Sequence, residues 1–91
     1  MKATLTANKA KSLLEAGNQI TFYAKSNGWV NTEWIEVEFS ANVYGKFSFW
    51  VRVMDDREDG EWERQSSWAE TLRYLKELGA DFKNATIEKA A

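Results

Sequence analysis

Carboxylate pairs are the groups in this sequence that could do chemistry, because its 91 residues include no His and no Cys. Glu36 lies two residues from Glu38, and Asp55 adjoins Asp56. Such pairs perform acid–base catalysis when burial separates their pKa values. Glu36 and Glu38, however, fall on the water-facing side of an alternating pattern, where nothing desolvates them. Without a histidine base or a thiol nucleophile, we expect no catalytic residues and no enzyme activity.

A run of acids between residues 55 and 63 is the second chemical feature. It holds six carboxylates in nine residues, namely Asp55, Asp56, Glu58, Asp59, Glu61 and Glu63. A run of this kind attracts basic protein surfaces and repels nucleic acid. It is therefore a candidate partner-binding segment. The alternative is a solvated loop whose charges keep the protein soluble.

The start of this acidic run has the spacing of a calcium-binding loop, Asp55-x-Arg57-x-Asp59-Gly60. Calcium needs oxygen ligands, but the third position of the loop carries the cation Arg57. The twelfth position carries Ser66, where a calcium loop needs a bidentate Glu. We therefore expect no metal ion and no cofactor.

Three segments with strictly alternating apolar residues predict the strands that position these acids. The strands are expected at Gln19 to Lys25, Glu33 to Ala41 and Lys46 to Met54. Asn27-Gly28 predicts a turn between the first two, because both residues tolerate positive φ. Residues 42–45 form the turn between the other two, and residues 61–64 favour a short fourth strand.

Two helices are expected to flank the strands, from about Ala7 to Ala16 and from about Trp68 to Leu78. Thr6 can cap the first helix, and Ser67 with Glu70 forms a capping box at the second. Each helix has one apolar stripe that can face the sheet. The stripe of the second helix consists of Trp68, Leu72, Leu75 and Leu78.

This order of elements predicts an α+β fold in a single domain over residues 1–91. We expect a three- to four-stranded antiparallel meander, with the N-terminal and the C-terminal helix packed on one face. Residues 80–91 are expected to form a tail, and Phe82 to fold back onto the core.

The opposite face of the expected sheet stays open to water or to a partner. Alternation places Tyr23, Trp34, Glu36, Glu38, Trp50 and Arg52 on it. Trp, Tyr and Arg dominate the energetics of protein interfaces, so these residues are the other candidate partner-binding residues. The alternatives are that Trp34 and Trp50 pack against each other across the strands, or that the tail covers them.

Net charge and apolar patterning limit the class of partner. The formal net charge is −2, which argues against strong direct binding to a phosphate backbone. Residues 1–32 carry +3, residues 33–63 carry −6 and residues 64–91 carry +1. The sequence has neither the apolar core of a signal peptide nor the roughly 18 apolar residues of a spanning helix. We therefore expect a cytoplasmic protein that does not bind membranes.

Nucleic-acid binding through the sheet is the alternative class. The order helix, three strands, helix also occurs in double-stranded RNA-binding domains. Those domains have a basic cluster at the start of the last helix, where this sequence reads Ser66-Ser67-Trp68-Ala69-Glu70. Aromatic residues on an open sheet can stack single-stranded bases, but Glu36 and Glu38 would oppose the backbone.

Four segments together resemble a loose class of proteins. They are the helix end Leu13-Leu14-Glu15-Ala16-Gly17, the meander from Gln19 to Met54, the acidic run from Asp55 to Glu63, and the helix from Trp68 to Leu78. This assembly looks like the small phage-encoded anti-defence proteins, including some anti-CRISPR and anti-restriction proteins. The resemblance lies in size and architecture. That class has no common sequence motif, so no site residue is carried over from it.

The resemblance implies an inhibitor that blocks a host defence protein, or a protein–nucleic-acid complex, with a basic surface. A net charge of −2 favours local blocking of such a partner over mimicry of DNA across the whole surface. We therefore expect a non-catalytic, protein-binding module that is a monomer or a homodimer. The alternatives are a sheet-face nucleic-acid-binding domain and a homodimeric structural protein.

Overall fold

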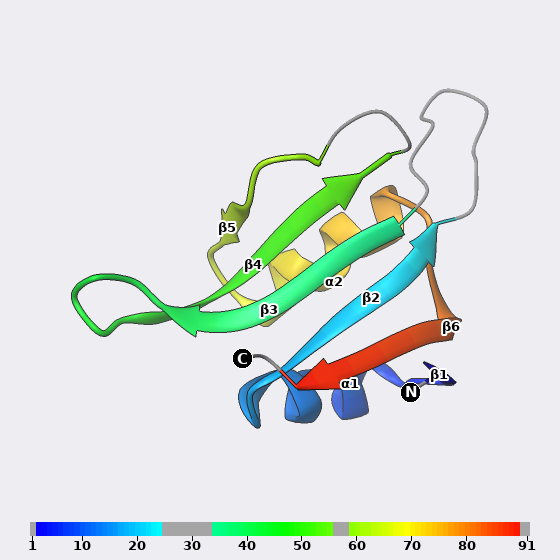
Figure 1. Cartoon of the computed structure of the whole chain (residues 1–91), viewed down its shortest axis with the longest axis horizontal. Helices are drawn as coiled ribbons and strands as arrows, with labels where there is room; N and C mark the ends of the chain where they lie inside the picture. The colour runs from blue at the N-terminus through cyan, green and yellow to red at the C-terminus, as the bar shows by residue number, and fades with distance from the viewer. Residues whose placement is uncertain (1, 25–33, 56–58, 90–91) are drawn as a thin grey trace.

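The computed structural model describes residues 2–24, 34–55 and 59–89. Its helices and strands follow the sequence in the order shown in Figure 1. They are β1 Lys2–Ala3, α1 Ala7–Glu15, β2 Asn18–Ala24, β3 Trp34–Ala41, β4 Phe47–Met54, β5 Glu63–Gln65, α2 Trp68–Glu77 and β6 Ala80–Lys89. The expected turn at Asn27-Gly28 lies outside the described residues.

The described strands form one antiparallel sheet with the order β1-β6-β2-β3-β4-β5. The α+β class and the antiparallel sheet are confirmed. The expectation of three to four strands was wrong, because the sheet has six. Both additional strands come from the ends of the chain, and β6 lies between β1 and β2.

The expectation that residues 80–91 form a tail was also wrong for residues 80–89, which form β6. A β-bulge explains why the pattern did not predict this strand. Phe22 pairs with Ala85, whereas its neighbour Tyr23 pairs with Asp81. The apolar residues that pack on the core therefore change phase along β6: Ala80 and Phe82 precede the shift, and Ala85 follows it. A search for strict alternation fails at such a step.

Both helices begin where the capping residues predicted. The Thr6 hydroxyl accepts a hydrogen bond from the Lys9 backbone N–H at 3.2 Å, and the Ser67 hydroxyl accepts one from the Glu70 N–H at 3.1 Å. The Glu70 side chain forms an ion pair with Arg73 at 3.2 Å. The Ser67 half of the predicted capping box therefore starts α2, and the partner of the Glu70 carboxylate is Arg73 on the helix surface.

The apolar stripe of α2 differs from the expected one by a single position. Leu75 is buried, and Trp68 and Leu78 pack against the core as expected. Thr71 is fully buried, whereas Leu72 is half-buried. The Thr71 hydroxyl donates to the Ser67 carbonyl at 2.8 Å, so its burial leaves no unpaired hydroxyl.

Both helices lie behind the sheet in Figure 1 and share one hydrophobic core with it. The core side of the sheet is apolar on every central strand. Its fully buried side chains from β2, β3 and β4 are Ile20, Phe22, Ile35, Val37 and Val51. The segment before α1 closes the core at the side of β6, where the Leu5 N–H donates to the Phe82 carbonyl at 2.7 Å.

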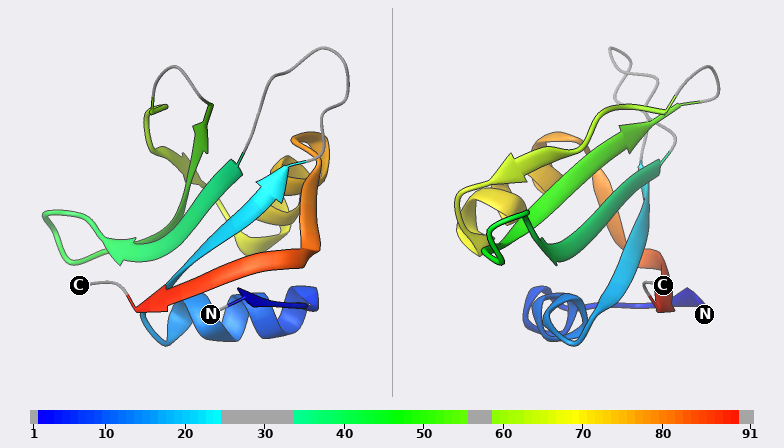
Figure 2. Two further views of the ribbon diagram at one scale, coloured as in Figure 1. Left: turned by 45° about the vertical axis from the view of Figure 1, so that its right-hand side comes forward. Right: turned by 60° about the vertical axis from the view of Figure 1, so that its left-hand side comes forward.

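The turn between β3 and β4 carries an exposed apolar tip. Asn42 Oδ1 accepts from the backbone N–H groups of Tyr44 and Lys46 at 2.8 and 3.1 Å. Gly45 makes the reversal possible with a φ of +77°, and its N–H donates to the Asn42 carbonyl at 2.9 Å. Val43 and Tyr44, which we call the hairpin tip, are 93% and 89% exposed. The hairpin projects at one end of the molecule (Figure 1 and Figure 2).

Candidate binding face

The side of the sheet that faces away from the helices is the candidate binding surface, and we call it the open face. The register arranges its residues in rows that cross the strands. Tyr23, Trp34 and Met54 form one row, and Thr21, Glu36 and Arg52 form the next. Glu38, Trp50 and Arg64 form a third row. The structure therefore brings together all six candidate residues from the strands: Tyr23, Trp34, Glu36, Glu38, Trp50 and Arg52.

Trp34 and Trp50 are not cross-strand partners. Trp34 is opposite Met54 and Trp50 is opposite Glu38, and the row of Glu36 lies between them. The alternative in which the two indoles pack directly against each other is therefore wrong. A covering tail is wrong as well, because residues 80–89 extend the sheet beside β2. Both indoles are half-buried, and Tyr23 is 56% exposed.

A polar cluster lies at the centre of the open face. Arg52 donates to Glu36 Oε1 from Nε at 2.9 Å and also from Nη2. Gln19 Nε2 donates to the second carboxylate oxygen of Glu36. The Arg52 guanidinium also lies 4.8 Å from the centre of the Trp62 ring, within the range of a cation–π contact. Glu36 thus has its partners within the chain, and its main effect is to orient Arg52.

Trp62 is a residue of this surface that sequence reasoning missed. The signal was available, because the strand expected at residues 61–64 places position 62 on the same side as Arg64. Trp50 is positioned by a separate contact: its Nε1 donates to the Ser40 carbonyl at 3.4 Å. The Ser40 hydroxyl donates to Glu38 at 3.4 Å. The open face therefore carries three indoles, and two of them, Trp50 and Trp62, are held by a hydrogen bond and a cation–π contact.

A depression of about 260 Å³ opens between β6, β2 and β3. Its lining residues are Thr21, Tyr23, Trp34, Asn84 and Thr86. Asn84 and Thr86 belong to β6, so assigning residues 80–91 to a tail hid this part of the surface. Two aromatic side chains with short polar neighbours make the depression suitable for an aromatic or aliphatic group with one hydrogen-bonding end.

The described acids of the run do not all lie on the open face. Asp56 and Glu58 lie outside the described residues. Asp55 is half-buried, whereas Asp59 and Glu61 are exposed. Glu63 is opposite Val51, so it belongs to the helix side of the sheet. Asp59 is opposite the open-face residue Met54, so Asp59 and Glu63 lie on opposite sides of the sheet.

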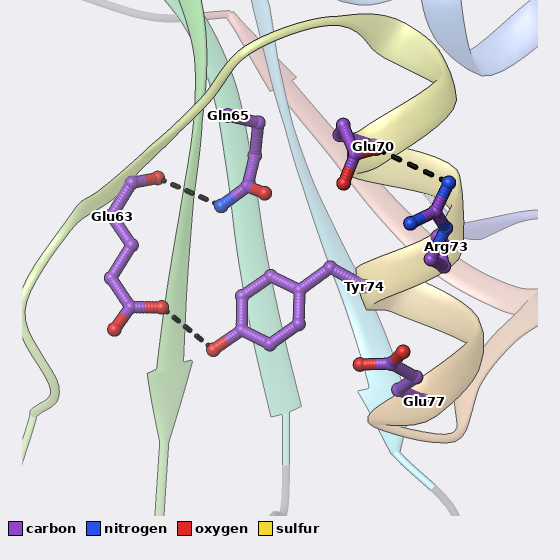
Figure 3. Close-up of a pocket in the computed structure, with 6 residues that line it drawn as sticks. All are labelled: Glu63, Gln65, Glu70, Arg73, Tyr74 and Glu77. Carbon is purple, nitrogen blue, oxygen red and sulfur yellow. Dashed lines mark hydrogen bonds and ion pairs between the residues drawn. The ribbon is translucent and has the colours of Figure 1, made fainter.

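Glu63 contributes to a second pocket, of about 290 Å³, between β5 and α2 (Figure 3). The Tyr74 hydroxyl donates to Glu63 Oε2 at 2.8 Å. The other lining residues are Gln65, Glu70, Arg73 and Glu77. Burial, followed by the hydrogen bond to Glu63, raises the pKa of Tyr74 from 10.0 to about 12. Tyr74 is therefore a hydrogen-bond donor at neutral pH and is not suited to act as a base.

Within residues 2–24, 34–55 and 59–89, no group of three or more His, Cys, Asp or Glu side chains is placed to hold a metal ion. Over the same residues, no helix is both long enough and apolar enough to cross a membrane. Comparison with known proteins finds no matching family model, no matching curated protein and no matching solved structure.

Proposed function

We propose that this chain is a non-catalytic module that binds another protein through its open face. One observation carries the proposal: Tyr23, Trp34, Trp50 and Arg52 lie together on the side of the sheet that the helices leave uncovered. These residue types concentrate binding energy at protein interfaces. A solvent-facing sheet without a binding role is usually polar.

The order of the open face supports this proposal. Binding costs free energy whenever flexible side chains become immobilised. Arg52 is already held by Glu36 and by the Trp62 ring, and Trp50 is already hydrogen-bonded to the backbone of β3. Much of the ordering cost therefore arises during folding and not during binding.

The partner that we propose is a host protein, or a protein–nucleic-acid complex, with a basic surface. The carboxylates available to such a partner are Glu38 on the open face and the exposed Asp59, which is opposite the open-face residue Met54. Glu61 is exposed as well. The resemblance to phage-encoded anti-defence proteins supports a role as a small inhibitor in the host cytoplasm. Covering the partner's binding surface is then the mode of inhibition.

Affinity capture from a bacterial lysate tests the proposal when wild type is compared with Trp50→Ala, with and without nuclease. We expect a protein partner that survives nuclease treatment and binds Trp50→Ala at least about 30-fold more weakly, or about 2 kcal/mol. Arg73→Ala is the matched control, because Arg73 is an exposed residue of α2 on the other side of the sheet.

Two results would contradict the proposal. The first is a folded Trp50→Ala variant that keeps the affinity of wild type. The second is a set of captured partners that disappears with nuclease, which would instead support the nucleic-acid-binding alternative.

A further inference from the structure

The hairpin tip is an apolar feature that the proposed function leaves unexplained. Val43 and Tyr44 are the two most exposed large apolar side chains of the described chain. The turn that carries them is held by two hydrogen bonds to Asn42 Oδ1. At its base, the rings of Phe39 and Phe47 stack with their centres 5.2 Å apart. The tip is therefore a fixed projection, suited to entering a complementary hollow.

The same chain carries a hollow of matching chemistry. The depression beside Tyr23 and Trp34 is lined by two aromatic rings and short polar groups, so it can accept a Tyr side chain. Its lining residue Trp34 begins β3, whereas the hairpin tip follows the other end of that strand. Figure 1 shows the hairpin at the far end of β3 from the end where the strand begins. The seven residue steps from Trp34 to Ala41 span about 23 Å, so a tip cannot reach the depression of its own chain.

We propose that a second copy of this chain covers the open face, with the hairpin tip of each copy inserted into the depression of the other. In this arrangement both contacts are the same, tip to depression, so the two copies are related by a two-fold axis and form a closed dimer. The midpoint between Trp34 and Val43 along β3 falls at Glu38 and Phe39, and Glu38 is opposite Trp50. The axis therefore passes close to Trp50, which places the two Trp50 indoles at the centre of the interface.

Charge and area are both compatible with this arrangement. The cation Lys46 follows the tip by two residues, and Asp81 is the register partner of Tyr23 beside the depression. Each Lys46 therefore approaches an acid of the other copy. A stable interface buries roughly 800 Å² on each partner. The molecule measures 39 × 25 Å across its two longest axes, and these extents set the upper limit on the area that one face can offer.

A lipid surface fits the tip less well. Peripheral binding to membranes needs a cluster of cations or a second anchor in addition to a few apolar side chains. Lys46 is the single cation between residues 41 and 47, and the net charge of the chain is −2. An anionic membrane would therefore repel the protein as a whole.

The second copy occupies the face that a partner would use, so dimer formation would block partner binding. This regulatory role rests on the proposed function. The free protein is then a dimer that must separate before it binds. The apparent affinity for the partner is the affinity of the monomer multiplied by the fraction of chains that are monomeric.

Engineered cysteines test the arrangement directly, because the natural chain has none. Val43→Cys and Thr86→Cys are purified separately, mixed and oxidised. We expect a mixed disulfide dimer between tip and depression, and little linkage of Val43→Cys to itself, because the two tips lie far apart. Ser12→Cys is the matched control on the exposed surface of α1, and it should not link to Val43→Cys.

Light scattering across a range of concentrations gives the second readout. Wild type should be dimeric at high concentration, and Tyr44→Ser should raise the dimer dissociation constant at least about tenfold. Tyr44 is 89% exposed, so this variant is expected to fold, and circular dichroism checks that it does.

Several results would overturn the inference. They are a wild type that stays monomeric at every concentration, a preferred tip-to-tip disulfide, and binding of monomers to anionic phosphatidylserine vesicles. A Tyr44→Ser variant that loses a lysate partner while wild type is monomeric would assign the tip to that partner instead. Cross-linking uses purified protein alone, so its failure is distinguishable from an unsuccessful capture experiment.

Discussion

Arg52 shows how one residue can serve both the fold and the open face. Its guanidinium donates to Glu36 and lies over the Trp62 ring. The Arg52 and Glu36 side chains are only 24% and 15% exposed, so the pair is largely removed from water. Loss of one member leaves the other with an uncompensated charge, which costs more than loss of both.

Arg52→Met should therefore lower the free energy of unfolding by roughly 1–3 kcal/mol, the cost of leaving a buried polar group without its partner. The double variant Glu36→Gln/Arg52→Met should lose less, because no carboxylate is left unpaired. Urea denaturation measures both. Arg73→Met is the control: Arg73 and Glu70 are 67% and 42% exposed, and such a pair contributes about 0.5 kcal/mol or less. Equal losses for Arg52→Met and Arg73→Met would contradict the importance of the central pair.

Tyr74 gives a prediction about pH. Its pKa of about 12 in the folded protein exceeds the ordinary value of 10.0 because of burial and the Glu63 carboxylate. The unfolded chain therefore loses this proton first as pH rises. The stabilising contribution of the neutral phenol is complete below about pH 10 and is lost between about pH 10 and 12.

Ultraviolet titration at alkaline pH should show one tyrosine that ionises near pH 12 in wild type and is missing in Tyr74→Phe. The unfolding free energy of wild type should also fall more steeply over this interval than that of the variant. Tyr44→Phe is the control for loss of an exposed phenol. The interpretation fails if Tyr74→Phe removes a tyrosine that ionises near pH 10.

Strand alternation in the sequence was enough to predict which residues share the open face. Tyr23, Trp34 and Trp50 share a face because β2, β3 and β4 alternate without interruption. Alternation alone, however, does not reveal what each side chain contacts. Glu36 was expected to bind a partner, but it is already bonded to Arg52. Such pairing depends on rotamers and on the neighbouring strand, which a single strand pattern does not contain.

At the scale of elements, β6 has the largest consequence. It pairs with both β1 and β2, and its Phe82 ring lies 4.7 Å from the ring of Phe22. Ala85 is fully buried against the core. A strand in this position protects the edge of β2 and fills one side of the core.

Removal of residues 80–91 should therefore unfold the protein, because β2 would lose one of its two neighbours and the core would lose several apolar side chains. Circular dichroism and the dispersion of amide proton signals measure the outcome. A chain that lacks only residues 90 and 91 is the control and should fold. A folded chain of residues 1–79 would show that β6 is dispensable.

The contrast between β6 and the helices shows which elements a sequence can predict. The helices α1 and α2 have local signals in the Thr6 and Ser67 caps. The strand β6 has apolar residues that change phase at a bulge, and β1 has only two residues. A bulge is set by pairing with β2, and β1 exists through pairing with β6. Information of this kind lies in contacts between distant segments and not in local periodicity.

For the whole molecule, the fold separates features that are adjacent in the sequence. The acidic run and the open face were both expected to bind a partner, but Glu63 bonds to Tyr74 on the helix side. Conversely, Thr86 lies beside Thr21 across β6 and β2, although 65 positions separate them. The open face is therefore made from three separate parts of the chain, so no short sequence motif corresponds to it.

The pairing of β1 with β6 has a consequence for the connectivity of the chain. Lys2 is opposite Thr86 on adjacent, antiparallel strands, so the chain enters and leaves the described fold at one edge. A short peptide could join these ends, and new ends could be opened elsewhere in the chain. The fold is therefore suited to circular permutation. Opening the chain at Gly45 would cut the hairpin tip away from its turn and leave β6, β2, β3 and β4 paired. The contribution of the hairpin tip could then be tested separately from that of the open face, without replacing any side chain.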